Sequence, residues 1–126
     1  MQPDQKLVEA IQKFASLAAN RYCLVEVWLF GSRARGTHVE ESDVDVAVIL
    51  QGARRDQRFL DVKLDMSDLA FDVLLESGLN ISPFPIWEDE WANSGSHTNP
   101  SLLHNIKNEG VLIVGSVLGE KRESDN

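Results

Sequence analysis

Apolar residues recur along the first half of the chain in two rhythms, and each rhythm predicts a different element. Between residues 4 and 19 they follow helical spacing, which predicts an amphipathic helix. Its apolar positions are Leu7, Val8, Ile11, Phe14, Ala15, Leu17 and Ala18. Two short runs, 23–30 (CLVEVWLF) and 43–50 (DVDVAVIL), are rich in β-branched and aromatic residues and predict mostly buried strands. Between them, GSRARG predicts a tight turn that Ser32 caps, and THVEES predicts a loop.

The second half alternates helix and strand again. Residues 58–76 carry one apolar stripe, and Gly78 is a stop signal just beyond it. That stripe consists of Val62, Met66, Leu69, Ala70, Val73 and Leu74. Residues 79–86 (LNISPFPI) alternate like a strand, but two prolines confine them to a sheet edge. A helix over 101–109 and a short apolar segment, GVLIVG, follow a turn-rich loop.

This order predicts an α/β domain, a small mixed β-sheet flanked by helices. We expect one domain over residues 1–118 and a disordered tail over 119–126. The 43% of hydrophobic residues suffices for a core without cross-links.

Charge and cysteine content narrow the function classes. A net charge of −8 argues against direct nucleic-acid binding, which needs a basic face. The single cysteine, Cys23, excludes an internal disulfide, favours a reducing compartment and is expected in the core. The sequence shows neither a signal peptide nor an apolar run of membrane-spanning length, so we expect a cytoplasmic protein.

The start of the second strand carries two acidic residues, Asp43 and Asp45. Side chains at i and i+2 of a strand share one face, so the two carboxylates should lie side by side while Val44, Val46 and Val48 face the core. Adjacent carboxylates repel unless a cation lies between them. A hard divalent cation such as Mg²⁺ takes such oxygen ligands together with phosphate oxygens. The spacing therefore suits a metal–nucleotide site, although a D-x-D at a strand start is also a common solvated edge.

The preceding turn supplies groups suited to the phosphates. Gly31 lets the backbone approach a ligand, and Ser32 offers its hydroxyl and neighbouring N–H groups. Arg33 and Arg35 add positive charge that offsets a triphosphate.

Together, a strand, Gly-Ser, ten intervening residues, D-x-D and a second apolar strand resemble the DNA polymerase β-type nucleotidyltransferase superfamily. The stretch LFGSRARG…SDVDVAVIL is most similar to the minimal nucleotidyltransferases, the MNT-type antitoxins paired with HEPN-domain toxins.

The resemblance implies a polymerase β-like palm fold and a division of labour within the site. Gly31 and Ser32 match the pair that holds the nucleotide, and Arg33 and Arg35 match the basic positions after it. Asp43 and Asp45 match the catalytic Mg²⁺ ligands. The implied reaction transfers AMP from ATP to a hydroxyl of a partner protein, a HEPN ribonuclease toxin.

The chain departs from the family pattern on the strand after the long helix. A third carboxylate is expected there, and Asn80 or Ser82 stands in its place. An amide or hydroxyl can contact a metal through oxygen, but it brings no negative charge and does not act as a base. Asp72 is a weak substitute, better explained as part of a solvated helix face. The catalytic base is therefore unassigned.

The remaining candidates are best explained structurally. Three histidines without metal-ligand spacing are expected on the surface: His38, His97 and His104. Trp87 and Trp91 predict core packing or a lid, or a partner anchor. Two charged runs have structural explanations. A solvated helix start is expected for Arg54, Arg55 and Arg58, and a surface run or a helix start for Glu88, Asp89 and Glu90 after the third strand.

Three functions remain open from the sequence. The first is an Mg²⁺-dependent enzyme that modifies a toxin, and the second is a catalytically weak or inactive antitoxin that neutralises by binding alone. The third is a transferase for a small molecule such as an aminoglycoside, which usually carries an additional helical domain. Homo- or hetero-oligomers are compatible with all three.

Overall fold

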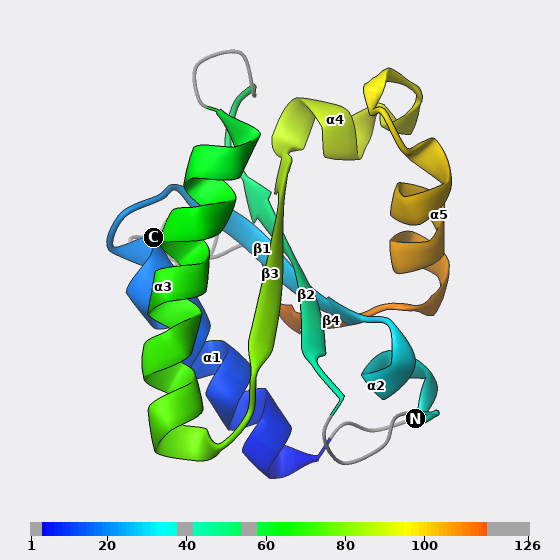
Figure 1. Cartoon of the computed structure of the whole chain (residues 1–126). Helices are drawn as coiled ribbons and strands as arrows, with labels where there is room; N and C mark the ends of the chain where they lie inside the picture. The colour runs from blue at the N-terminus through cyan, green and yellow to red at the C-terminus, as the bar shows by residue number, and fades with distance from the viewer. Residues whose placement is uncertain (1–3, 38–41, 54–57, 116–126) are drawn as a thin grey trace, which may run out of the picture.

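The computed structural model describes residues 4–37, 42–53 and 58–115, and shows one four-stranded sheet with helices on both faces (Figure 1). The predicted α/β class with a mixed sheet is confirmed. The elements in chain order are α1 (Gln5–Ala19), β1 (Leu24–Phe30), α2 (Ser32–Arg35), β2 (Val44–Leu50), α3 (Phe59–Ser77), β3 (Ile81–Trp87), α4 (Glu88–Ala92), the 3-10 turn η2 (Ser94–Ser96), α5 (Pro100–Glu109) and β4 (Val111–Val114). None of the helices in these ranges is long and apolar enough to cross a membrane.

The strands lie in the order β3-β2-β1-β4. β1 pairs antiparallel with both β2 and β4, whereas β2 and β3 run parallel. Pro83 and Pro85 lie on β3, which is an edge strand as their missing N–H groups predict. The C-terminal apolar segment GVLIVG provides the opposite edge, β4.

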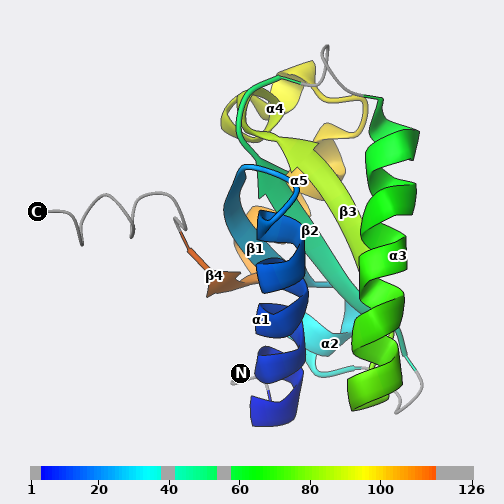
Figure 2. The ribbon, with the colours of Figure 1, turned by 90° about the vertical axis from the view of Figure 1, so that its left-hand side faces the viewer.

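Two hydrophobic cores lie on the two faces of the sheet. Figure 2 shows α1 and α3 side by side on one face, with α4 and α5 on the other. Val44, Val46 and Val48 are fully buried in the core under α1 and α3, as the alternation predicts. Ala47 and Ile49 are buried in the other core with residues of α5. Asp45 is on the face of Ala47 and Ile49, because side chains two apart on a strand share a face.

The long helix ends where the sequence predicts. Gly78 adopts a positive φ of 76° and its N–H bonds to the carbonyl of Leu74, 2.8 Å away. Glycine reaches this left-handed conformation without steric cost, so it terminates α3.

Two predicted environments were wrong. Cys23 is exposed rather than in the core, because it lies in the turn before β1, where its carbonyl accepts a hydrogen bond from Gln51 N–H. His97 is 6% exposed rather than on the surface. The turn after α4 folds its ring against Phe84, and Nδ1 accepts a hydrogen bond from Asn99 N–H. His104 is exposed as expected, whereas His38 and the tail 119–126 lie outside the described residues.

Candidate active site

The two predicted acidic residues lie at the start of β2. Asp43 immediately precedes the strand and is exposed, while Asp45 is partly buried. In the β1–β2 ladder Asp45 is opposite Phe30, the last residue of β1. The Gly31–Ser32 turn therefore begins beside the carboxylate of Asp45, as the glycine–serine and D-x-D spacing suggested.

Gly31 is required at this point for two independent reasons. Its backbone has φ 78° and ψ −156°, a conformation that is essentially restricted to glycine. A Cβ atom at this position would also lie 2.5 Å from Oδ2 of Asp45. The turn and the carboxylate thus approach each other as closely as a residue without a side chain permits.

The turn itself is the short helix α2, and Ser32 is its first residue rather than its cap. Gly31 occupies the cap position and accepts hydrogen bonds from the N–H groups of Ala34 and Arg35. The predicted Ser32 cap was therefore wrong. In the described structure the Ser32 hydroxyl makes no hydrogen bond to protein, so it is available to a ligand.

The two arginines of α2 have different surroundings. Arg33 donates from Nε and Nη2 to the carbonyl of Ser42, at 3.1 and 2.9 Å. It braces the turn against the residue directly before Asp43. Arg35 lies 3.6 Å from a carboxylate oxygen of Glu109 on α5 and remains half-exposed. Arg35 is thus the better placed of the two to interact with a bound anion.

The neighbouring strand β3 contributes an amide where a third carboxylate was expected. Nδ2 of Asn80 donates to Oδ1 of Asp43 at 3.0 Å. Ser82 pairs with Asp45 in the parallel register. Both residues that the sequence singled out therefore adjoin the acidic pair. Across the described ranges, no three histidine, cysteine, aspartate or glutamate side chains form a metal-binding cluster.

Electrostatics at the pair are unfavourable for two ionised carboxylates. Burial raises the pKa of Asp45 above its ordinary value, and the neighbouring Asp43 raises it further. Lys63 and Arg35 lower it in part. Burial and the adjacent Asp43 thus disfavour the ionised form of Asp45 more than the two cations favour it.

A pocket of about 230 Å³ opens beside Asp43. Asn80 and Ser82 line it from the β3 side, and Ser67 and Phe71 line it from α3. Open space therefore adjoins the Asp43 carboxylate, between β3 and α3.

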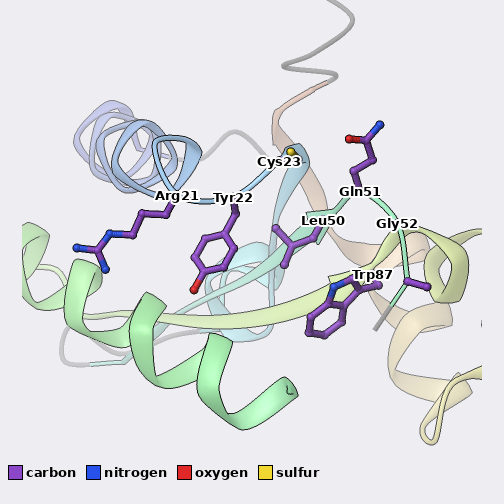
Figure 3. Close-up of a pocket in the computed structure, with 8 residues that line it drawn as sticks. Arg21, Tyr22, Cys23, Leu50, Gln51, Gly52 and Trp87 are labelled. Carbon is purple, nitrogen blue, oxygen red and sulfur yellow. The ribbon is translucent and has the colours of Figure 1, made fainter. Parts of the chain in front are cut away.

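A second cavity lies at the opposite end of the sheet, where β1 begins and β2 ends (Figure 3). It measures about 320 Å³ and includes Arg21, Tyr22, Cys23 and Trp87 in its lining. The Tyr22 hydroxyl donates to Asp65, 2.6 Å away. Among the described residues that line this cavity there is no carboxylate.

This combination of strand, Gly-Ser turn and D-x-D strand is matched by a known family model. The model described as polymerase beta, nucleotidyltransferase, matches residues 12–86, from α1 to β3. The chain belongs to the polymerase beta nucleotidyltransferase family. The match spans every element that positions the acidic pair.

A curated relative points the same way. The chain is 38% identical over 80 residues to the putative protein adenylyltransferase MJ1305 of Methanocaldococcus jannaschii. The alignment covers 64% of this chain and 49% of the relative, so the chain spans about half the length of that protein.

Two solved structures share the nucleotidyltransferase fold. A toxin–antitoxin crystallised with AMP-PNP has a TM-score of 0.58 and 20% identity, covering 90% of this chain and 77% of that one. A tri-AMPylated HEPN toxin of Shewanella oneidensis in complex with an MNT antitoxin has a TM-score of 0.54 and 18% identity. That match covers 93% of this chain and 76% of the other. Similarity at this identity supports the fold.

The other sequence candidates lie away from the pair. Asp72 is exposed on α3 and does not line the pocket, and Arg58 pairs with Asp61 at the start of α3. The acidic run 88–90 forms the first turn of α4, which confirms the expected helix start, and within it Glu90 is buried. Arg54 and Arg55 lie outside the described residues.

The tryptophans serve packing. Trp87 is 1% exposed in the core, and Trp91 packs against Trp28 with ring centroids 5.7 Å apart. Lys107 Nζ lies 4.7 Å from the Trp91 ring centroid, beside the core that contains Ala47 and Ile49.

Sequence reasoning missed Lys63. This side chain extends from α3 to the β3 edge, where Nζ donates to the carbonyl of Pro83 at 2.7 Å. It is one of two cations that lower the pKa of Asp45. Its only signal in the sequence is its position beside the apolar stripe of the helix, which does not reveal the strand that it reaches.

Proposed function

We propose that this chain transfers a nucleoside monophosphate, AMP from ATP, to a hydroxyl group of a partner protein in the cytoplasm. The partner is a HEPN-domain toxin, and the modification neutralises it. The observation that carries the proposal is the Asp43–Asp45 pair beside the glycine-only turn at Gly31 and the unengaged Ser32 hydroxyl.

Divalent metal fits the donors of this site. Asp43, Asp45, Asn80 and Ser82 all offer oxygen, the ligand type that Mg²⁺ prefers. Asp45 already has a raised pKa caused partly by Asp43, a repulsion that a cation would relieve. Asp43 and Asp45 would hold the ion, with Asn80 and Ser82 beside it. When bound, Mg²⁺ supplies charge neutralisation at the phosphates and at the departing pyrophosphate.

The residues of the chain then act by orientation. Gly31 permits the triphosphate to approach the backbone, while Ser32 and Arg35 offer a hydroxyl and a cation to its oxygens. The acceptor oxygen forms a bond to the α-phosphorus, the bond from that phosphorus to the leaving bridging oxygen breaks, and pyrophosphate departs. The acceptor proton is released to water, and no residue is assigned as the catalytic base.

The relatives support the choice of nucleotide and partner. The Methanocaldococcus relative is named as a protein adenylyltransferase, and the two structural neighbours are toxin–antitoxin complexes, one holding AMP-PNP and one an AMPylated HEPN toxin. This chain has the same fold over at least 90% of its length.

A second function is favoured by one observation. An amide, Asn80, contacts Asp43, and Ser82 adjoins Asp45, in the place where the resemblance implies a third carboxylate. A catalytically weak or inactive antitoxin that neutralises its toxin by contact would need no such group.

The test separates the two functions. The purified chain is incubated with Mg²⁺ and ATP, CTP, GTP or UTP labelled at the α-phosphate, with and without the product of the adjacent gene. We expect label on the partner from ATP, lost with EDTA and with Asp43→Asn. A tight complex without label from any nucleotide would favour neutralisation by binding.

A further inference from the structure

The helix α3 carries a second apolar stripe that faces away from both cores. Its members are Leu60, Leu64, Phe71 and Leu75, which are 56–70% exposed. Their spacings of four, seven and four residues place them on one face of the helix. Of the five large hydrophobic residues exposed within the described ranges, four are in this outer stripe. Such a concentration, unlike scattered exposed leucines, marks an interaction surface.

An acidic row runs beside the outer stripe. Four acidic residues each directly follow a member of the stripe, and Asp68 lies between them on the same side of the helix: Asp61, Asp65, Asp68, Asp72 and Glu76. Three of them are engaged: Asp61 with Arg58, Asp65 with Arg21 and Tyr22, and Glu76 with Lys13.

The two acidic residues in the middle of the row lack a partner among the described residues. Asp68 and Asp72 form no ion pair or hydrogen bond with any residue that the structure describes. Two uncompensated carboxylates therefore flank Leu64, Phe71 and Leu75. A surface of this kind complements an apolar face bordered by lysine or arginine.

The outer stripe is continuous with the candidate active site. Phe71 and Ser67 line the same pocket as Asp43. The β3 edge lies against this side of α3, where Lys63 bonds to the Pro83 carbonyl. Figure 2 shows α3 at the margin of the molecule, with no other element covering its outer side. A partner lying along this helix would reach the acidic pair at one end of its contact.

We propose that the outer stripe of α3 is the docking surface for the acceptor protein. The occupant is a partner helix with an apolar face bordered by basic residues, which places an acceptor hydroxyl near Asp43. This inference rests on the proposed function, because it takes the acceptor to be a protein. A second copy of this chain is disfavoured as the occupant, since it would bring another acidic row and a further charge of −8.

The test measures binding to the purified HEPN-domain protein by isothermal titration calorimetry. The variant Leu64→Gln with Leu75→Gln removes two apolar contacts outside the pocket, and its affinity should fall about tenfold or more. Leu112→Gln, at the exposed leucine of β4, is the matched control and should bind within about twofold of the unmodified chain.

Charge reversal is an independent test, which remains informative if the leucine variant folds poorly. Asp68→Lys should weaken binding and flatten its salt dependence, whereas Glu88→Lys on α4, with the same change in net charge, should not. Unchanged affinity in both the leucine variant and Asp68→Lys would overturn the docking surface. A chain dimer that the leucine variant dissociates, with partner binding intact, would overturn it in favour of a second copy.

Failure of this surface is distinguishable from failure of the proposed function. The leucine variant should keep its affinity for ATP and recover label transfer at high partner concentration. Asp43→Asn should bind the partner and transfer nothing at any concentration. Partner binding that depends on the outer stripe, without transfer by any form, would retain the docking surface and reject the enzyme.

Discussion

Replacing Asp45 with asparagine should stabilise the cation-free protein. Burial and the adjacent Asp43 raise the pKa of Asp45 in the folded state above its unfolded value. A raised pKa in a folded carboxyl means that its stabilising contribution is complete below the unfolded pKa and is lost as pH rises through the folded pKa. At neutral pH the ionised Asp45 therefore opposes folding, and the neutral amide removes that penalty.

The size of the effect follows from the strand geometry. Residues at i and i+2 are about 6.6 Å apart at roughly 3.3 Å per residue. Two unit charges at that separation repel by about 0.6 kcal/mol in water and about 2.5 kcal/mol at an effective dielectric constant of about 20. Asp43 is exposed, and Lys63 and Arg35 offset part of the repulsion. We therefore expect a gain of about 1 kcal/mol, or about 4 °C in Tm for a chain of this size.

The assay is thermal unfolding followed by circular dichroism at neutral pH and low salt. In EDTA, Asp45→Asn should have a higher Tm than the unmodified chain. The control Glu9→Gln, a substitution at an exposed position of α1, should leave Tm nearly unchanged. Added Mg²⁺ should raise the Tm of the unmodified chain and barely affect the variant. A less stable variant in EDTA, or an equal gain from Mg²⁺ in both proteins, would refute the reasoning.

Three further predictions test separate parts of the account. Gly31→Ala should lower the free energy of unfolding by about 1–3 kcal/mol because of the positive φ at this position, and the added Cβ would also clash with Asp45. Denaturant unfolding measures this loss, and unchanged stability would contradict the turn geometry. Asn80→Asp should supply the missing third carboxylate, so the Mg²⁺ concentration needed for half of the rise in Tm should fall; an unchanged midpoint would show that Asn80 does not adjoin the ion. Tyr22, the single tyrosine, should ionise with a pKa of about 12, raised first by burial and then by its hydrogen bond to Asp65. Its contribution to stability should be lost as pH rises from about 10 to about 12, and absorbance at alkaline pH that titrates near the ordinary value would contradict that environment.

The parts of the fold set by local pattern could be predicted from the sequence. Alternation placed Val44, Val46 and Val48 in one core, and Pro83 and Pro85 confined β3 to an edge. These features depend on residues within one element, so periodicity and backbone chemistry suffice to identify them.

The features that depend on pairing between elements were beyond sequence patterns. The hydrogen bond from Asn80 to Asp43 follows from parallel β2–β3 pairing, and Lys63 reaches Pro83 only because α3 packs beside β3. Exposure of Cys23 and burial of His97 likewise depend on how turns fold back on the sheet.

The outer stripe of α3 shows another limit of pattern reading. The helix has apolar residues on two faces, and a search for one buried face identifies Val62 and its partners and passes over Leu64 and Leu75. Only the packed structure shows which of two apolar faces remains uncovered.

The central claim is that the Asp43–Asp45 pair transfers AMP to a partner protein. The most direct test is the intact mass of the purified HEPN-domain partner after incubation with this chain, ATP and Mg²⁺. We predict a mass increase of one or more adenylyl groups, absent when Asp43→Asn with Asp45→Asn replaces the unmodified chain in an equally tight complex. An unmodified partner in a stable complex, or equal modification by the double variant, would contradict the claim.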